Sequence, residues 1–153
     1  MWLKSGKIVT PDSLVVDVSG AIYLLNHRSF AGIIVEAFEE LISPPIYEVE
    51  MANICWKYVR FGQWQAIQAQ QLLKASLDLT DRLSIDPISE VLDTALLQDL
   101  SAYDASYFHL CKTTGASLLS LDKKLNRIAK ANGIECLIDK IANSSWPSAD
   151  RFE

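Results

Sequence analysis

The chain contains 153 residues, of which 50% are apolar and 22% charged, and its formal net charge is −5. This length suffices for one well-buried core but is short for two, so we expect a single domain. This negative charge argues against binding nucleic acid through overall positive charge, so only a local basic patch could bind it. The charge also suits a protein that gathers carboxylates around a divalent cation.

The first recognisable element is a buried strand. Residues 14–18 are apolar and mostly β-branched, and a single acid, Asp17, interrupts them near their end. Such a run predicts a strand of a parallel sheet with Asp17 at its carboxyl end. A helix-like segment at 21–25 follows Gly20, and residues 30–41 repeat apolar side chains at helical spacing, which predicts a helix there.

The next helix is predicted to carry polar chemistry beside its packing face. Pro44 and Pro45 end the preceding helix and open a new one at 46–60, because proline is tolerated in a first helical turn. Glu50 reaches the edge of the core, whereas Glu48 falls near the opposite side of this helix and is expected to be solvated. Next to the apolar stripe runs a polar stripe formed by Glu50, Asn53, Lys57 and Arg60.

The second half of the chain continues to alternate helices with short apolar segments. A short edge strand is expected at 82–87, where Pro87 ends it. Residues 116–121 predict a second buried strand that ends at Asp122, and residues 134–138 predict a third. The helices predicted in this half are 64–77, 89–100, 104–114 and 123–132.

This order of elements is typical of an α/β domain with a short parallel sheet, because crossover-length segments separate the strands. We expect one three-layer α/β/α domain with a Rossmann-like order over residues 14–138. An N-terminal extension at 1–13 precedes it, and a tail at 139–153 either packs on the domain or is disordered. Trp146 and Phe152 are the tail residues expected to pack back.

The cysteines and the lack of a targeting segment indicate a reducing compartment. The three cysteines are odd in number, widely spaced and set among apolar residues, which suits buried thiols rather than disulfides or zinc ligands. No apolar run approaches the roughly 20 residues of a membrane helix, and the first residues lack the apolar stretch of a secretory signal. We therefore expect a cytoplasmic protein that does not bind membranes.

Four acids occupy positions where a parallel α/β sheet binds its ligands. Asp17 and Asp122 follow buried strands. Asp104 begins a helix, and Glu50 lies on a half-buried helix face. Asp104 and Asp122 are equally well placed as ordinary helix caps, whereas a desolvated carboxylate such as Asp17 needs a cation or a hydrogen-bond donor. As a set, the four acids suit the oxygen-rich site that a hard divalent ion prefers.

Other chemistries lack the residues that they require. Neither His27 nor His109 has a cysteine or a second histidine at ligand spacing, and no Gly-x-Ser-x-Gly segment is present. The glycine-rich phosphate loops of the usual nucleotide-binding folds are also absent. The sequence therefore argues against a zinc site, a serine hydrolase and those nucleotide folds, and both histidines are interpreted as surface or packing residues.

Four short motifs occur in a definite order along the chain. They are Val15-Val16-Asp17-Val18-Ser19, the Glu-x-x-Asn pattern of Glu50 and Asn53, Tyr103-Asp104-Ala105-Ser106-Tyr107, and Leu118-Leu119-Ser120-Leu121-Asp122. In this order and spacing they resemble the motifs of the PIN domains, and among these the ribonuclease toxins of the VapC type. The resemblance extends from about residue 15 to residue 137, with Ser120 where that family usually has threonine.

The resemblance implies a metal-dependent endoribonuclease that hydrolyses RNA phosphodiester bonds with Mg²⁺ or Mn²⁺. Its catalytic and metal-ligating residues would be Asp17, Glu50, Asp104 and Asp122. Side chains that orient these ligands would be Ser19, Asn53 and Ser120. The basic residues that could hold the RNA backbone, each of which also suits a solvated helix face, are Lys57, Arg60, Lys123, Lys124 and Arg127.

The resemblance also implies a protein antitoxin as partner, and we expect a homodimer. A competing interpretation is a catalytically silent PIN-like scaffold that binds a protein through apolar helix positions such as Ile33, Ile34 and Phe38. A third, a phosphoacceptor signalling domain, requires adjacent acids on the first strand, and Asp17 has no acidic neighbour. No further acid closely follows Asp122, so the sequence leaves open whether one ion or two would bind.

Overall fold

The computed structural model describes residues 12–142. The parts of the predicted extension and tail at 1–11 and 143–153, with Trp146 and Phe152, lie outside the described residues. None of the described helices is long and apolar enough to cross a membrane. The strands are β1 (Ser13–Val16), β2 (Glu40–Ser43), β3 (Asp81–Arg82) and β4 (Ser117–Leu119). The helices are α1 (Val18–Asn26), α2 (Arg28–Ala37), α3 (Ile46–Arg60), α4 (Ala66–Leu79), α5 (Ser89–Gln98), α6 (Ala102–Thr114), α7 (Lys123–Ala131) and α8 (Leu137–Ala142).

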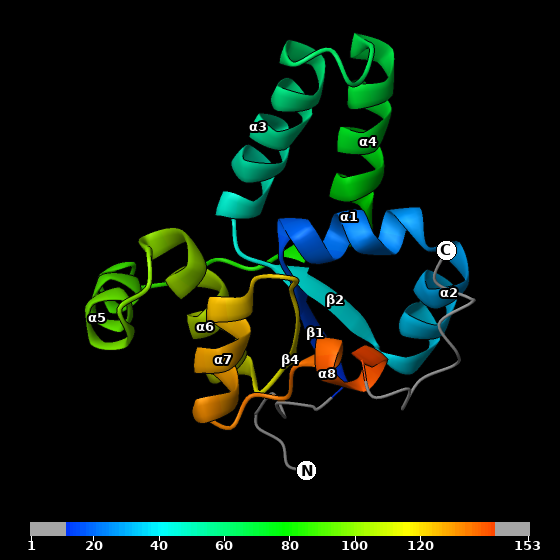
Figure 1. Ribbon diagram of the computed structural model, residues 1–153. Helices are drawn as coiled ribbons and strands as arrows, with labels where there is room; N and C mark the ends of the chain where they lie inside the picture. Colours follow the sequence, from blue (N-terminus) through cyan, green and yellow to red (C-terminus); the bar gives the residue numbers. More distant parts are fainter. Residues whose placement is uncertain (1–11, 143–153) are drawn as a thin grey trace.

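The four strands form one parallel sheet in the order β3-β2-β1-β4. The central strand β1 pairs Val15 with Ile42 of β2 and Val16 with Leu119 of β4. In the view of Figure 1, α1 and α2 lie to one side of the sheet, and α5, α6 and α7 lie to the other. The predicted α/β/α fold with a short parallel sheet is therefore confirmed.

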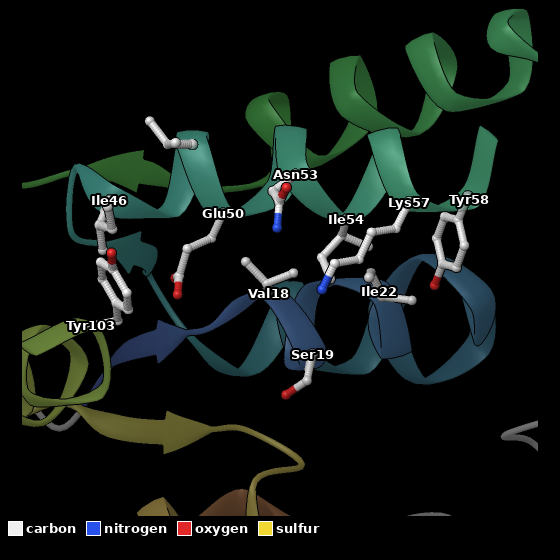
Figure 2. A pocket seen from close by; sticks show the side chains of 11 residues that line it. Val18, Ser19, Ile22, Ile46, Glu50, Asn53, Ile54, Lys57, Tyr58 and Tyr103 are labelled. Atoms are coloured by element: carbon white, nitrogen blue, oxygen red, sulfur yellow. The ribbon is translucent and has the colours of Figure 1, made fainter. Parts of the chain in front are cut away.

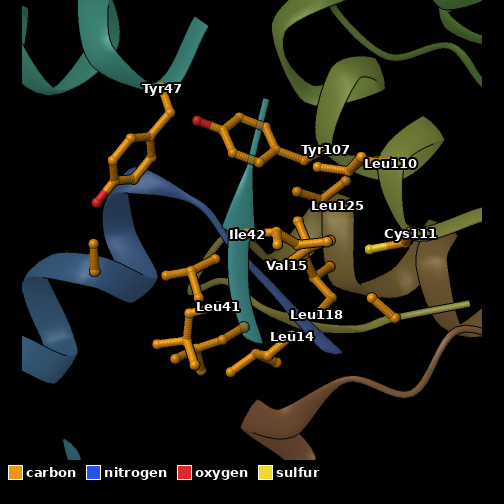
Figure 3. Packing of buried hydrophobic residues seen from close by; sticks show 14 of the residues in the cluster. Leu14, Val15, Leu41, Ile42, Tyr47, Tyr107, Leu110, Cys111, Leu118 and Leu125 are labelled. Carbon is orange, nitrogen blue, oxygen red and sulfur yellow. The ribbon is translucent and has the colours of Figure 1, made fainter. Parts of the chain in front are cut away.

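The core is built around the neighbouring strands β1 and β4. Leu14, Val15 and Val16 of β1 and Leu118 and Leu119 of β4 are completely buried. Side chains of α6 and α7 pack against these strands (Figure 3). Because helices cover both faces of the sheet, every residue of β1 and β4 is buried, instead of buried and exposed residues alternating along the strand. All three cysteines are buried and unpaired, as the sequence predicted.

The helix predicted over residues 30–41 extended too far at its carboxyl end. Helix α2 ends at Ala37, and Phe38 has the extended backbone angles φ −122° and ψ 137°. Residues Leu41 and Ile42 belong to β2, where they are buried beside β1. Their apolar side chains happen to continue the helical spacing of the preceding residues, which concealed the strand.

The strand predicted over residues 134–138 was also wrong. It is reduced to one bridge in which Cys136 pairs in parallel with Leu118. Helix α8 begins at the next residue, Leu137, so the chain leaves the sheet after that single contact. The edge strand expected at 82–87 corresponds to β3, which is shorter and begins at Asp81.

The helices α3 and α4 form a hairpin that projects beyond the sheet (Figure 1), and Arg82 joins the two helices at its base. Arg82 Nη1 donates to Thr80 O at 2.6 Å, and Nη2 donates to Leu77 O at 3.0 Å. These bonds satisfy carbonyl groups that the end of α4 leaves unpaired. Arg82 Nε donates to Glu48 Oε2 at 3.0 Å. The half-exposed side chain of Glu48, in the first turn of α3, therefore forms an ion pair with Arg82.

The first turn of α1 lies directly against β4, and Gly20 makes this approach possible. A Cβ atom at position 20 would collide with the backbone carbonyl of Leu119. The Gly20 N–H also donates to Asp17 Oδ1 at 2.8 Å. Glycine is therefore required here for a close backbone approach, and its presence fixes how α1 follows the strand end.

We predict that Gly20→Ala lowers the free energy of unfolding by about 1–3 kcal/mol, the usual cost of forcing a methyl group into a packed site. The backbone of β4 cannot move aside without disturbing its pairing with β1. Urea denaturation of the two proteins measures the difference.

Gly32→Ala is the matched control. Gly32 lies within α2, and nothing approaches the position of its added Cβ within 4 Å. That change should raise the free energy of unfolding by about 0.5–1 kcal/mol, because alanine favours helix over glycine. Equal effects of the two substitutions would show that α1 does not approach β4 as described.

Candidate active site

Asp17 lies at the point where the carboxyl ends of β1 and β4 meet. Its N–H donates to Leu119 O at 3.2 Å, which continues the pairing of the two strands by one residue. The residue is 8% exposed. Its Oδ1 accepts from Gly20 N and thereby caps α1. The structure thus places a nearly buried carboxylate at the end of a central strand.

Two serine hydroxyls connect this carboxylate to the turn between β4 and α7. Ser19 Oγ donates to Asp17 Oδ1 at 2.7 Å and accepts from Leu121 N at 2.9 Å. Ser120 Oγ donates to Asp17 Oδ2 at 2.5 Å and accepts from Asp122 N at 3.0 Å. A hydroxyl has a single proton to donate, so both serines direct that proton to Asp17. This arrangement favours an ionised carboxylate that accepts on both oxygens.

Asp122 is the N-cap of α7. Its Oδ1 accepts from Leu125 N at 2.7 Å, and the residue is exposed. Asn126 supports the same turn, because its Nδ2 donates to Ser120 O at 2.8 Å and to Asp122 O at 2.9 Å. The capping role that the sequence left open for Asp122 is therefore present in the structure, beside the acids that Asp122 was predicted to join.

Glu50 projects from α3 and is held by a tyrosine of α6. The hydroxyl of Tyr107 donates to Glu50 Oε1 at 2.7 Å. Tyr107 is 1% exposed, and burial raises the pKa of its hydroxyl far above the usual range, so the hydroxyl stays protonated. The structure places Glu50 near the other acids, whereas Glu48 lies outside the site in its ion pair with Arg82.

Asp104 lies in the first turn of α6 and is partly buried. The N-cap of this helix is Ser101, whose Oγ accepts from Asp104 N at 3.1 Å. The alternative that Asp104 is merely a helix cap is therefore wrong. Its carboxylate instead stands near the positive end of the helix dipole, within electrostatic reach of the other acids.

We call Asp17, Glu50, Asp104 and Asp122 the acidic cluster, because their charges act on one another. Burial is the main cause that raises the pKa of Asp17, and the charge of Asp104 raises it further. Burial also raises the pKa of Glu50, with added repulsion from Asp104 and Asp17. The pKa of Asp104 is raised by burial and then by Asp122. At neutral pH, unfavourable negative charge is therefore concentrated at this end of the sheet.

The donor atoms of the acidic cluster fit a divalent cation in their chemistry. Carboxylate oxygens are the ligands that hard ions such as Mg²⁺ prefer, and a cation would relieve the repulsion that raises their pKa values. Among residues 12–142, however, no group of three or more His, Cys, Asp or Glu side chains is gathered closely enough to hold a metal ion.

A cavity of about 680 Å³ opens beside the acidic cluster, between α1 and α3 (Figure 2). Apolar side chains of both helices form most of its wall. Glu50 lies at its edge, so a molecule in the cavity would reach the cluster. Its polar lining includes residues that the sequence singled out, namely Ser19, Glu50, Asn53 and Lys57.

The predicted basic residues belong to α3 and α7. Lys57 lines the cavity, and Arg60 is the last residue of α3. Burial and the charge of Asp122 raise the pKa of the Asp104 carboxyl group, and the nearby positive charge of Lys124 opposes them. The Nζ atom of Lys124 is also 3.7 Å from Asp99 Oδ2. The exposed basic residues that α7 contributes at this end are Lys123, Lys124 and Arg127.

The sequence placed Tyr107 in the motif around Asp104 but predicted no role for it in the site. It lies three residues after Asp104 and therefore on the same face of α6, which was a usable signal. Nothing local, however, links Tyr107 to Glu50, which precedes it by 57 residues. Tyr103 was missed as well, although it is 58% exposed and lines the cavity.

Comparison with known proteins identifies a matching family and two relatives. The sequence profile of the PIN domain matches residues 14–131. The chain is 33% identical over 119 residues to the ribonuclease VapC3 of Pyrobaculum aerophilum, across 73% of this chain and 91% of that protein. It is also 33% identical over 96 residues to the exonuclease VapC9 of the same organism, across 61% of this chain and 71% of that protein.

A solved structure has the same fold. The crystal structure of PAE2754 from Pyrobaculum aerophilum is similar to this structure with a TM-score of 0.70. The two sequences are 26% identical, and the match covers 87% of this chain and 96% of that chain. The similarity therefore extends over nearly the whole of both proteins.

We predict that Asp104→Asn stabilises the metal-free protein at pH 7. The pKa of Asp104 is higher in the folded state than in the unfolded chain, so ionisation above about pH 4 costs folding free energy. The variant should melt roughly 1–3 °C higher at pH 7, the shift that less than 1 kcal/mol produces in a chain of this size. The advantage should disappear below about pH 4, where the aspartate is protonated in both states.

Asp93→Asn removes one exposed negative charge from α5 and controls for the change in net charge. It should leave the melting temperature almost unchanged at both pH values. Thermal unfolding followed by circular dichroism in the presence of a chelator measures both variants. If Asp104→Asn behaves like Asp93→Asn at pH 7, the acids do not repel one another as described.

Proposed function

The chain belongs to the PIN-domain family, and from this membership we propose that it is a metal-dependent endoribonuclease that hydrolyses RNA phosphodiester bonds. The acidic cluster is the observation that carries the proposal. Burial raises the pKa of the Asp17 carboxyl group, and the charge of Asp104 raises it further. Burial likewise raises the pKa of Glu50, with added repulsion from Asp104 and Asp17. The names of two relatives, a ribonuclease and an exonuclease, support nuclease activity for this chain.

PIN-domain nucleases generally use divalent metal ions, and we propose Mg²⁺ or Mn²⁺ for this one. When bound, such an ion lowers the pKa of a coordinated water and stabilises the charge that develops on the scissile phosphate. The four carboxylates of the acidic cluster would hold it. Ser19 and Ser120 would keep the Asp17 carboxylate in place through the hydrogen bonds described above.

The proposed RNA substrate would lie across the cavity and the nearby helix ends. Asn53 and Lys57 line that cavity beside Glu50, where they can contact a phosphate or a base. Because the chain carries a net charge of −5, contact with the RNA backbone depends on local basic residues. These residues would be Lys57, Arg60, Lys123, Lys124 and Arg127.

We further propose that the protein is the cytoplasmic toxin of a toxin–antitoxin pair, that it binds a protein antitoxin and that it forms a homodimer. The VapC names of its relatives support the toxin assignment. Exposed apolar side chains support contact with other chains, since large apolar patches commonly mark interaction surfaces. On α5 these are Leu92, Leu96 and Leu97, which are 57%, 74% and 80% exposed.

We predict that Asp17→Asn abolishes Mn²⁺-dependent cleavage while the protein stays folded. The substitution removes the charge at the centre of the cluster but keeps an oxygen that can accept from Gly20 N. Cleavage is measured on total cellular RNA, which offers many sequence contexts, and on a circular single-stranded RNA. Cutting of the circle distinguishes an endonuclease from an exonuclease, and circular dichroism monitors folding.

Asp93→Asn is the control and should cleave like the wild type. The proposed mechanism is wrong if Asp17→Asn retains full activity, or if the wild type cleaves in excess chelator. A wild type that neither binds Mn²⁺ nor cleaves either RNA would instead favour the silent binding scaffold.

A further inference from the structure

Tyr107 connects two members of the acidic cluster that come from different helices. It lies on α6, one helical turn after Asp104 and on the same face. From there its hydroxyl donates to Glu50 Oε1 on α3 at 2.7 Å. Figure 3 shows the ring reaching from α6 with its hydroxyl turned toward α3. Helix α6 thus supplies one acid of the cluster and holds a second.

The two partners of this hydrogen bond differ in their freedom to move. Tyr107 is 1% exposed, and the surrounding core fixes the orientation of its ring. Glu50 has more rotatable side-chain bonds, lies on a partly exposed helix face and borders an open cavity. A bond from a fixed donor to a mobile carboxylate selects one orientation among those that the glutamate can adopt. The hydroxyl therefore directs Glu50 rather than the reverse.

A second buried tyrosine shows what an ordinary structural hydroxyl does in the same region. Tyr47 is completely buried, and its hydroxyl donates to the backbone carbonyl of Ser76 at 2.9 Å. That bond connects α3 with α4 and touches no carboxylate. Tyr47 and Tyr107 lie near each other above the sheet (Figure 3). Each hydroxyl thus donates to one acceptor, but only one of these acceptors is an acid.

We propose that Tyr107 is a positioning residue, whose hydroxyl holds the Glu50 carboxylate beside Asp17 and Asp104 in the orientation that binds the divalent cation. This inference rests on the proposed function. Removing a side chain that orients a metal ligand typically weakens metal affinity by about 10–100-fold. The same loss is expected here, although Tyr107 itself touches neither the ion nor the RNA.

The test compares Tyr107→Phe with Tyr47→Phe in the full chain. Mn²⁺ affinity is measured on the metal-free protein by titration, with free Mn²⁺ followed by electron paramagnetic resonance. Tyr107→Phe should weaken Mn²⁺ binding by about 10–100-fold, whereas Tyr47→Phe should bind Mn²⁺ like the wild type. In RNA cleavage at a fixed Mn²⁺ concentration, Tyr107→Phe should lower kcat and leave the KM for RNA unchanged, because it alters no RNA contact.

A double-mutant cycle with Glu50→Gln tests whether the hydroxyl acts through Glu50. Once the carboxylate is gone, adding Tyr107→Phe should cause no further loss of Mn²⁺ affinity. The inference fails if Tyr107→Phe binds Mn²⁺ like Tyr47→Phe, or if its effect is undiminished in the Glu50→Gln protein. In both cases a wild type that binds Mn²⁺ and cleaves RNA leaves the proposed function standing. A wild type that does not bind Mn²⁺ overturns both.

Discussion

The rest of the site depends on the buried carboxylate of Asp17 at the end of β1. It accepts hydrogen bonds from Ser19, Gly20 and Ser120, and these bonds join β1, the start of α1 and the turn after β4. Each serine also accepts a backbone N–H of that turn, so the direction of every proton in the network is determined. A neutral carboxyl group would have to donate a proton where both neighbouring hydroxyls already donate. The fold around Asp17 is thus arranged for a negative charge that burial disfavours.

The other acids also carry negative charges that burial disfavours. The charges that the proposed function needs therefore lower the stability of the fold. Burial and mutual repulsion raise the pKa values of Asp17, Glu50 and Asp104, so each ionisation at neutral pH costs folding free energy. A domain selected for stability alone would have neutral or apolar residues at these positions. The buried apolar core below them stabilises the fold and offsets the free energy that these charges cost. Lys124 offsets only part of the repulsion, at Asp104.

The sequence predicted β1 and β4 well, but it predicted β2, β3 and the segment near Cys136 poorly, for a physical reason. A strand buried on both faces consists mainly of a continuous apolar run, so β1 and β4 were recognisable without any knowledge of their neighbours. Strand β2 is equally short, but Leu41 and Ile42 continue the apolar spacing of the helix before it. Near Cys136 an apolar run makes only one bridge, because α8 begins at the next residue. Pairing depends on contacts with distant residues, which a local pattern does not contain.

The acids themselves were predictable because their positions follow from local rules, whereas the ways in which they are held were not. Asp122 is held within its own helix turn, and Asp104 lies in a first turn that Ser101 caps. Asp17 is held mainly by residues that follow it closely and by the neighbouring strand end. Glu50 has the longest side chain and depends on Tyr107, 57 residues away. The motif around Asp104 includes Tyr107, but the contact of its hydroxyl with Glu50 follows only from the three-dimensional structure.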